Sequence, residues 1–241
     1  MMRGLVHELR NPLSAILTAS SLLESGQSVD EETTMLLDVI KKESQRMNRI
    51  LTEFSLFVKP PLSHPENFDI AKVLRGLLHE MQTTGALDSS IQLRDELPAN
   101  LLVFADPVQS YQAFQHLLNN AAQSMEKGGV LTLHTKASQQ NESNLSNERE
   151  SVVIFLEDEG AGLSETALER AFQPFFSTKP AATGLGLSIA CELLGASGGG
   201  VLVENRDFNR ENCDSGQPAT LGARVRVHLR PATESSDYSS S

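Results

Sequence analysis

The sequence of 241 residues is poor in aromatic side chains and in cysteine, and it contains no tryptophan. Aromatic residues make up 5% of the chain, so we expect a core that is packed mainly from aliphatic side chains. The two cysteines, Cys191 and Cys213, do not have the spacing of a metal-binding motif. They fit reduced thiols in a cytoplasmic protein.

Basic charge and long apolar runs are also scarce. Twenty Lys and Arg side chains stand against 31 Asp and Glu, and the net charge of −11 disfavours nonspecific attraction to nucleic acid. No run of roughly 18 apolar residues is present, and the N-terminus lacks the layout of a signal peptide. We therefore expect a soluble, cytoplasmic chain that does not bind nucleic acid.

The first sixty residues carry two helical patterns. Apolar residues recur at steps of three and four in two seams, which the polar Gly26-Gln27-Ser28 segment separates. Asp30 is the predicted N-cap of the second helix, and Pro60-Pro61 ends that helix. Because a lone hairpin cannot bury both seams on both sides, we expect dimerisation into a four-helix bundle. The seams, which only the polar Ser20 and Glu43 interrupt, contain Val6, Leu9, Leu13, Ile16, Ser20 and Leu23, then Leu36, Ile40, Glu43, Met47, Ile50, Phe54 and Phe57.

The remainder alternates short strand patterns with helical ones, which predicts an α/β domain. The polar stretch 138–151 is an expected exposed loop, and the chain ends in an expected disordered tail. Helices are predicted over residues 68–82, 107–126 and 187–194, and Asp69 is the predicted cap of the first of them. Strands are predicted over residues 91–93, 101–105, 130–136, 152–157, 201–204 and 223–229.

A polar stripe follows the first predicted helix. His7, Asn11, Ser14 and Thr18 recur at helical spacing beside the apolar seam. An exposed imidazole, with a pKa of about 6.5, is largely neutral and nucleophilic at pH 7. Glu8 can orient the ring or accept its second proton, and Pro12 should bend the helix. Taken alone, such a histidine is more often an ordinary surface residue.

Two glycine-rich segments lie farther along the chain. Asp158-Glu159-Gly160-Ala161-Gly162-Leu163 follows a predicted strand, and its glycines allow positive φ and close approach to a ligand. Gly184-Leu185-Gly186-Leu187 opens a predicted helix, whose free amides can face phosphate. This segment is neither a Walker loop nor a dinucleotide fingerprint. Each pattern is weak alone, because Asp-x-Gly-x-Gly is common in turns.

Together these segments resemble the sensor histidine kinases. His7-Glu8-Leu9-Arg10-Asn11-Pro12-Leu13 resembles that family's phosphoacceptor box, and His116-Leu117-Leu118-Asn119-Asn120-Ala121-Ala122-Gln123-Ser124 resembles its N box. Residues 158–163, 172–179 and 184–190 resemble its remaining ATP-binding boxes, in the expected order. The resemblance covers residues 3 to 230. The short segment Pro180-Ala181-Ala182-Thr183 is most similar to the lid of the nitrogen-regulation branch.

The resemblance implies an α+β fold. Residues 1–60 would form the dimerising, phosphotransferring hairpin, a four-helix bundle in the dimer. Residues 66–231 would form an ATP-binding α/β sandwich like that of the Hsp90, gyrase and MutL ATPases, and residues 232–241 a disordered tail. In the hairpin, His7 would be the phosphoacceptor, Glu8 its acid/base partner and Asn11 the residue that places water for hydrolysis of the phosphorylated partner.

The resemblance also implies a site for ATP and Mg²⁺. Asp158 would accept a hydrogen bond from the adenine amine, and Asn120 would ligate Mg²⁺. His116 stands where a first asparagine is usual, and Asn119 is not the matching position. The plain alternative for Lys179 is a solvated lysine. For Asn119-Asn120 it is a solvated face of the helix. The remaining nucleotide-binding residues would be Gly160, Gly162, Lys179, Gly184, Gly186 and Leu187.

The implied function is an ATP-dependent protein-histidine kinase that autophosphorylates His7 and passes the phosphoryl group to an aspartate of a response-regulator receiver domain. A response-regulator-binding phosphatase with a degenerate ATP site is the second hypothesis, which His116 favours. An ATP-driven conformational machine is the third, which the His7 box disfavours. Because only six residues precede His7, we expect that an upstream sensor or membrane segment has been removed, or that a separate subunit provides the signal.

Overall fold

The computed structural model describes residues 2–25, 31–136, 151–179, 182–207 and 221–233. The chain divides into two compact units. One unit consists of Met1–Pro61 with Gln173–Ser188, and the other consists of Leu62–Phe172 with Ile189–Ser241.

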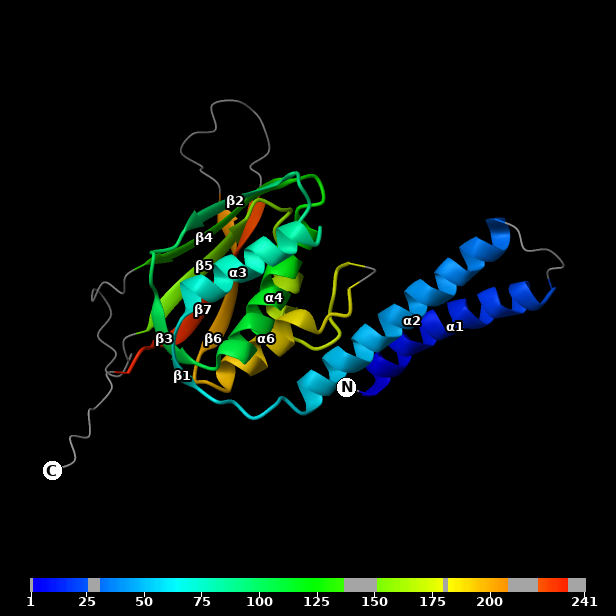
Figure 1. The fold of residues 1–241 in the computed structure, drawn as a ribbon, viewed down its shortest axis with the longest axis horizontal. Helices are drawn as coiled ribbons and strands as arrows, with labels where there is room; N and C mark the ends of the chain where they lie inside the picture. The colour runs from blue at the N-terminus through cyan, green and yellow to red at the C-terminus, as the bar shows by residue number, and fades with distance from the viewer. Residues whose placement is uncertain (1, 26–30, 137–150, 180–181, 208–220, 234–241) are drawn as a thin grey trace. The chain divides into compact units, whose positions relative to one another are not determined.

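Two long helices, α1 (Met2–Ser25) and α2 (Glu31–Val58), form the predicted hairpin (Figure 1). α1 continues without interruption through Pro12, whereas α2 ends two residues before Pro60, as predicted. The predicted break and the Asp30 cap lie outside the described residues. No helix in the described part of the chain is long and apolar enough to cross a membrane.

The hairpin buries only the facing sides of its helices. Ala19 and Ile50 are buried, but Leu13 of the predicted seam is 46% exposed, because two helices alone cannot cover it. This exposure is the result expected of a hairpin that needs a second copy to complete its core. The exposed large apolar side chains of the two helices are Leu13, Leu17, Leu22, Met35, Leu37, Val39, Leu51 and Val58.

The second unit is built on a mixed sheet. Its strands follow the order β1-β3-β7-β5-β4-β2, with β6 also paired to β7. Among the strand pairs of the described residues, β2–β4 is the only parallel one. The strands are β1 (Glu66–Asp69), β2 (Ile91–Glu96), β3 (Leu102–Ala105), β4 (Gly129–Lys136), β5 (Val152–Asp158), β6 (Gly200–Asp207) and β7 (Leu221–Pro231).

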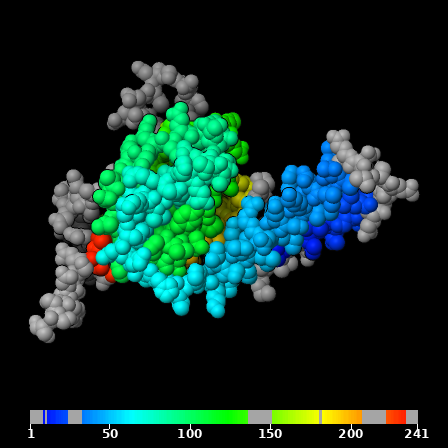
Figure 2. Space-filling model, viewed as in Figure 1, coloured from blue at the N-terminus to red at the C-terminus, as the bar shows by residue number. Residues whose placement is uncertain are grey.

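Helices cover one face of this sheet. α3 (Ile70–Thr83) and α4 (Pro107–Ser124) lie side by side across it, and α6 (Gly186–Gly195) lies on the same face (Figure 1). In Figure 2, the side chains of α3 and α4 cover the face that is turned to the viewer. Strand residues that point toward the helices are apolar, such as Leu133, Ile154 and Val227, and they form the aliphatic core that the composition predicts.

Two short elements differ from the prediction. Residues 66–69, of which Phe68 and Asp69 were assigned to a helix, form strand β1, which pairs with β3. Asp69 is nevertheless the N-cap of α3, as predicted, and its side chain accepts from the amide of Ala71. Helix α5 (Glu165–Arg170) was not predicted; it is short, and Ser164 caps it. The predicted loop 138–151 and tail 232–241 lie almost wholly outside the described residues.

Candidate functional site

The phosphoacceptor box lies within α1, where the sequence places it. His7 and Glu8 belong to this helix, but their side chains lie outside the described part of the structure. Asn11, Ser14 and Thr18 are exposed, so the polar stripe that continues from His7 faces solvent. A partner protein can therefore reach this stripe.

Helix α4 carries the residues of the predicted N box. Its N-cap, Asp106, is 5% exposed and accepts hydrogen bonds from the amides of Val108 and Gln109, at 2.9 Å each. His116 and Asn120 are half-buried and lie one turn apart, and Ser124 follows one turn later. These three polar side chains therefore share one stripe of the helix.

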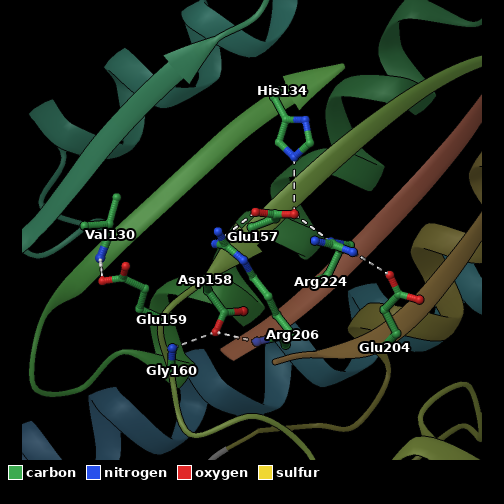
Figure 3. Close-up of polar contacts among 10 residues, drawn as sticks. Val130, His134, Glu157, Asp158, Glu159, Gly160, Glu204, Arg206 and Arg224 are labelled. Atoms are coloured by element: carbon green, nitrogen blue, oxygen red, sulfur yellow. Dashed lines mark hydrogen bonds and ion pairs between the residues drawn. The ribbon is translucent and has the colours of Figure 1, made fainter. Parts of the chain in front are cut away.

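Asp158 ends strand β5 and is 5% exposed. Its Oδ1 atom accepts a hydrogen bond from the amide of Gly160 at 2.9 Å (Figure 3). The same atom accepts from the hydroxyl of Ser124 at 3.0 Å and from the amide of Ala223 at 3.4 Å. Donors from the loop, from α4 and from β7 thus fix this carboxylate. A buried carboxylate held in this way is suited to accept a further hydrogen bond from a ligand amine.

The loop after Asp158 is clamped at both ends. The Glu159 carboxylate accepts from the amide of Val130 at 3.0 Å. The Asn205 side chain accepts from the amide of Leu163 at 2.8 Å and donates to its carbonyl at 2.7 Å. Asn205 was not predicted, because a single asparagine beside a strand pattern carries no motif.

The two glycines of this loop are required for different structural reasons. Gly162 has a φ of +68°, which confirms the prediction of positive φ. Gly160 is not among the positive-φ residues of the described chain, so the prediction of positive φ is wrong for this position. A Cβ atom at Gly160 would lie 2.5 Å from the Ser124 hydroxyl and 2.7 Å from the Ser124 carbonyl oxygen. Close packing against Ser124 therefore requires glycine here.

The second glycine segment lies in the same compact unit as the hairpin. Gly184 has a φ of +67°, and a Cβ atom there would lie 2.6 Å from the carbonyl carbon of Phe175. α6 begins at Gly186, one residue before the predicted start, with Leu187 half-buried in its first turn. A glycine-lined turn that leads into a helix N-terminus suits a phosphate group, because backbone amides can approach it closely.

Phe175 anchors the segment before this turn. It has a φ of +64°, its amide donates to the Gly184 carbonyl at 3.0 Å, and its ring centroid lies 6.3 Å from that of Phe54. Packing is thus an observed role for this phenylalanine. Lys179 is half-buried, and its carbonyl accepts from the Ser177 hydroxyl at 3.1 Å. A contact between Lys179 and phosphate stays a prediction.

No group of three or more His, Cys, Asp and Glu side chains in the described residues could hold a metal ion. Mg²⁺ in proteins commonly keeps several waters and binds through few protein ligands together with substrate phosphates. Asn120 is half-buried on α4, and its carboxamide oxygen is of the type that suits a site of that kind.

A charged network lies on the other face of the sheet. Glu157, 4% exposed, contacts His134 at 3.2 Å, Arg206 at 2.9 Å and Arg224 at 2.6 Å (Figure 3). Burial alone would raise the pKa of Glu157. The hydrogen bonds from His134 and Arg224 and the charges of both arginines outweigh burial and hold that pKa below its ordinary value of 4.5.

Glu157→Gln should lower the free energy of unfolding at pH 7 by about 2 kcal/mol, since it removes the charge of a buried carboxylate that pairs with the half-buried Arg206 and Arg224. The stabilisation by Glu157 is fully present above pH 4.5 and is lost as the pH falls through the lowered folded-state pKa. Urea titrations at pH 7 and at pH values below 4.5 should therefore show the difference between variant and parent shrinking in acid. Glu66→Gln, which changes an exposed carboxylate of β1, is the matched control; an equal loss in both variants would contradict the role of the network.

The helical hairpin and the α/β sandwich define the class of the molecule, a helical domain joined to a sandwich domain that carries the clamped carboxylate. Residues 1–61 match the His Kinase A (phospho-acceptor) domain, and residues 105–233 match the Histidine kinase-, DNA gyrase B-, and HSP90-like ATPase family. The chain belongs to that ATPase family, and with its phospho-acceptor domain it is a histidine kinase transmitter core.

Individual relatives agree with this assignment. The chain is 30% identical over 207 residues to sporulation kinase E of Bacillus subtilis (strain 168), which covers 85% of this chain and 26% of the relative. The chain spans 26% to 44% of the length of the curated relatives it matches.

Two solved structures share the fold. Histidine kinase ThkA in complex with response regulator protein TrrA has a TM-score of 0.70 at 23% identity, covering 97% of this chain and 61% of that one. Full-length ShkA in complex with AMPPNP has a TM-score of 0.62 at 22% identity, covering 94% and 44%.

Proposed function

We propose that this chain is the catalytic part of an ATP-dependent protein-histidine kinase, which phosphorylates its own His7 and passes the phosphoryl group to an aspartate of a response-regulator receiver domain. The Asp158 carboxylate carries this proposal, because it is 5% exposed and three donors hold it at the end of β5. It lies in the ATPase part of a chain whose N-terminal part matches a phospho-acceptor domain.

The nucleotide would bind with its adenine amine at Asp158, beside the loop that contains Gly160 and Gly162. Asn120 would ligate Mg²⁺, which would neutralise charge on the phosphates when bound. The positive φ and close packing of Gly184 support a phosphate role for the turn before α6. Gly186 and Leu187 would supply backbone amides there, and Lys179 a positive charge. The AMPPNP bound by ShkA supports a nucleotide as the ligand of this fold.

His7 would act as a nucleophile. One imidazole nitrogen attacks the γ-phosphorus in line, so that an N–P bond forms while the bond from phosphorus to the β-phosphate oxygen breaks and ADP leaves. Glu8 accepts the proton from the second nitrogen of the ring. The protein contributes mainly position and charge stabilisation, as expected for phosphoryl transfer.

The partners follow from the hairpin. Its exposed apolar side chains support a homodimer in which two hairpins form a four-helix bundle. The exposed stripe from Asn11 to Thr18 would receive the receiver domain, in keeping with the ThkA–TrrA complex. We place the chain in the cytoplasm, in the nitrogen-regulation branch, with a dimerisation domain at 1–60, a catalytic domain at 66–231 and a tail at 232–241. Any membrane contact would be made through a further segment.

Incubation of the purified chain with γ-labelled ATP and Mg²⁺ tests the proposal. We expect protein-bound label that is lost in acid and kept in alkali, because a phosphoramidate has these stabilities and a phosphoserine does not. Measurable ATP binding without label would instead favour the phosphatase hypothesis, which His116 raised.

Asn11→Ala should slow dephosphorylation of the partner at least tenfold while autophosphorylation changes less than twofold. The exposed carboxamide would position water for the phosphorylated aspartate, a contribution typical of a single orienting group. Both rates can be measured with phosphorylated receiver domain and with γ-labelled ATP. Equal loss of the two activities would contradict the water-positioning role, and Ser14→Ala on the same exposed stripe is the control.

A further inference from the structure

The geometry points to Ser124 as a positioning residue for the Asp158 carboxylate, and through it as a determinant of selectivity for purines that carry a 6-amino group. This inference rests on the proposed function, in which Asp158 accepts from adenine. Ser124 is the last residue of α4, and it is half-buried. Ser124 ends the segment that resembles the N box, but the roles that the resemblance implies for that segment do not include its hydroxyl group.

The Ser124 hydroxyl has two acceptors and one proton. Its oxygen lies 2.7 Å from the Ala121 carbonyl and 3.0 Å from Asp158 Oδ1. Met125 is the residue that follows α4. Its amide donates to the Ala122 carbonyl, not to the Ala121 carbonyl that a continued α-helix would use. An ionised carboxylate is the stronger acceptor, since hydrogen bonds to charged groups are about twice as strong as neutral ones. We therefore assign the proton to Asp158 when that carboxylate is ionised.

Gly160 provides a second, independent observation. A Cβ atom at this position would lie 2.5 Å from the Ser124 hydroxyl oxygen, so the loop has no room for any side chain there. The same glycine donates its amide to Asp158 Oδ1 at 2.9 Å. Ser124 and Gly160 thus form a matched pair that closes around one carboxylate oxygen.

The consequence concerns the orientation of the carboxylate. Donors from Ser124, Gly160 and Ala223 all reach Oδ1, and together they fix the plane of the group. Fixing that plane also fixes the direction of the Oδ2 lone pairs, which would accept from the 6-amino group. Loss of the Ser124 donor lets the carboxylate turn, which weakens recognition of the amine and leaves contacts to the rest of the nucleotide unchanged.

Calorimetric titration with two nucleotides tests this inference. For Ser124→Ala we expect the Kd of ADP to rise about fivefold to tenfold, roughly the value of one ordinary hydrogen bond, because the contact with the amine is weakened and not removed. The Kd of purine riboside diphosphate, which lacks the 6-amino group, should stay within twofold. Ser110→Ala, which removes another buried hydroxyl from α4, should change neither value.

A second pair of variants separates the hydroxyl from its packing. Threonine and valine are nearly isosteric, so Ser124→Thr should keep the preference for ADP, whereas Ser124→Val should lose it. Equal weakening of both nucleotides in Ser124→Ala, or equal behaviour of the Thr and Val variants, would overturn the inference. If Asp158→Asn leaves ADP affinity unchanged, the proposed adenine site itself fails. If that variant loses affinity while Ser124→Ala keeps its selectivity, only the role of Ser124 fails.

Discussion

Asp158→Asn should weaken ATP binding about a hundredfold while leaving the domain folded. The carboxamide must place its oxygen at the Oδ1 position, because three donors surround that position. Its NH₂ group then replaces Oδ2 and meets the adenine amine donor to donor. The lost charge-assisted hydrogen bond and the unfavourable contact together are worth about 3 kcal/mol, which corresponds to that loss.

The same geometry predicts a change of preference. An oxygen at the purine 6-position accepts from the new NH₂ group, so inosine triphosphate should lose less affinity than ATP, or gain affinity, in Asp158→Asn. Calorimetry with both nucleotides measures the ratio, and a thermal melt checks the fold. Unchanged ATP affinity would refute the assignment of Asp158, and an equal loss for both nucleotides would show that the variant disturbs the site as a whole.

Much of the fold was predictable because its elements carry their own periodicity. The hairpin seams, the helix capped by Asp106 and the strand that ends at Asp158 all follow repeats of local sequence. Strand β1 was missed because Glu66-Asn67-Phe68-Asp69 has no alternating pattern. It forms because β3 offers it backbone partners, which is information that a local window does not contain.

The site was predictable only where a motif names its residues. Asp158 ends strand β5 and Gly162 and Gly184 have the positive φ of turn glycines, as the motifs predict. The partners that hold the Asp158 carboxylate come from distant segments: Ser124 from α4, and Ala223 from β7. No spacing along the chain relates these residues, so their role appears only once the sheet register brings them together.

Strand β5 shows how one segment serves two purposes. Glu157 and Asp158 are consecutive, and because side chains alternate along a strand, they point to opposite faces. The first is held by arginines on the face away from the helices, and the second by Ser124 on the helix-covered face. The sequence shows two adjacent acids, yet one of them has a structural role and the other is proposed to bind adenine.

His7→Gln should abolish labelling from γ-labelled ATP. Glutamine keeps the size and polarity of the side chain, but its amide nitrogen has no available lone pair with which to attack phosphorus. Without a nucleophile the transfer has no acceptor, so label should fall to the background of a sample without Mg²⁺. ATP affinity should stay within twofold, because His7 lies in the part that matches the phospho-acceptor domain, apart from the residues 105–233 that match the ATPase family.

Each outcome of this experiment has a distinct meaning. His79→Gln, which changes an exposed histidine of α3, is the matched control and should label like the parent chain. Label that persists in His7→Gln with the same acid lability would assign the acceptor to another of the six histidines. Loss of ATP binding together with label would contradict the separation of acceptor and nucleotide sites. Loss of label alone, with ATP binding kept, would establish His7 as the group that receives the phosphoryl. Both variants replace one histidine by glutamine, and only His7→Gln removes a nucleophile from α1.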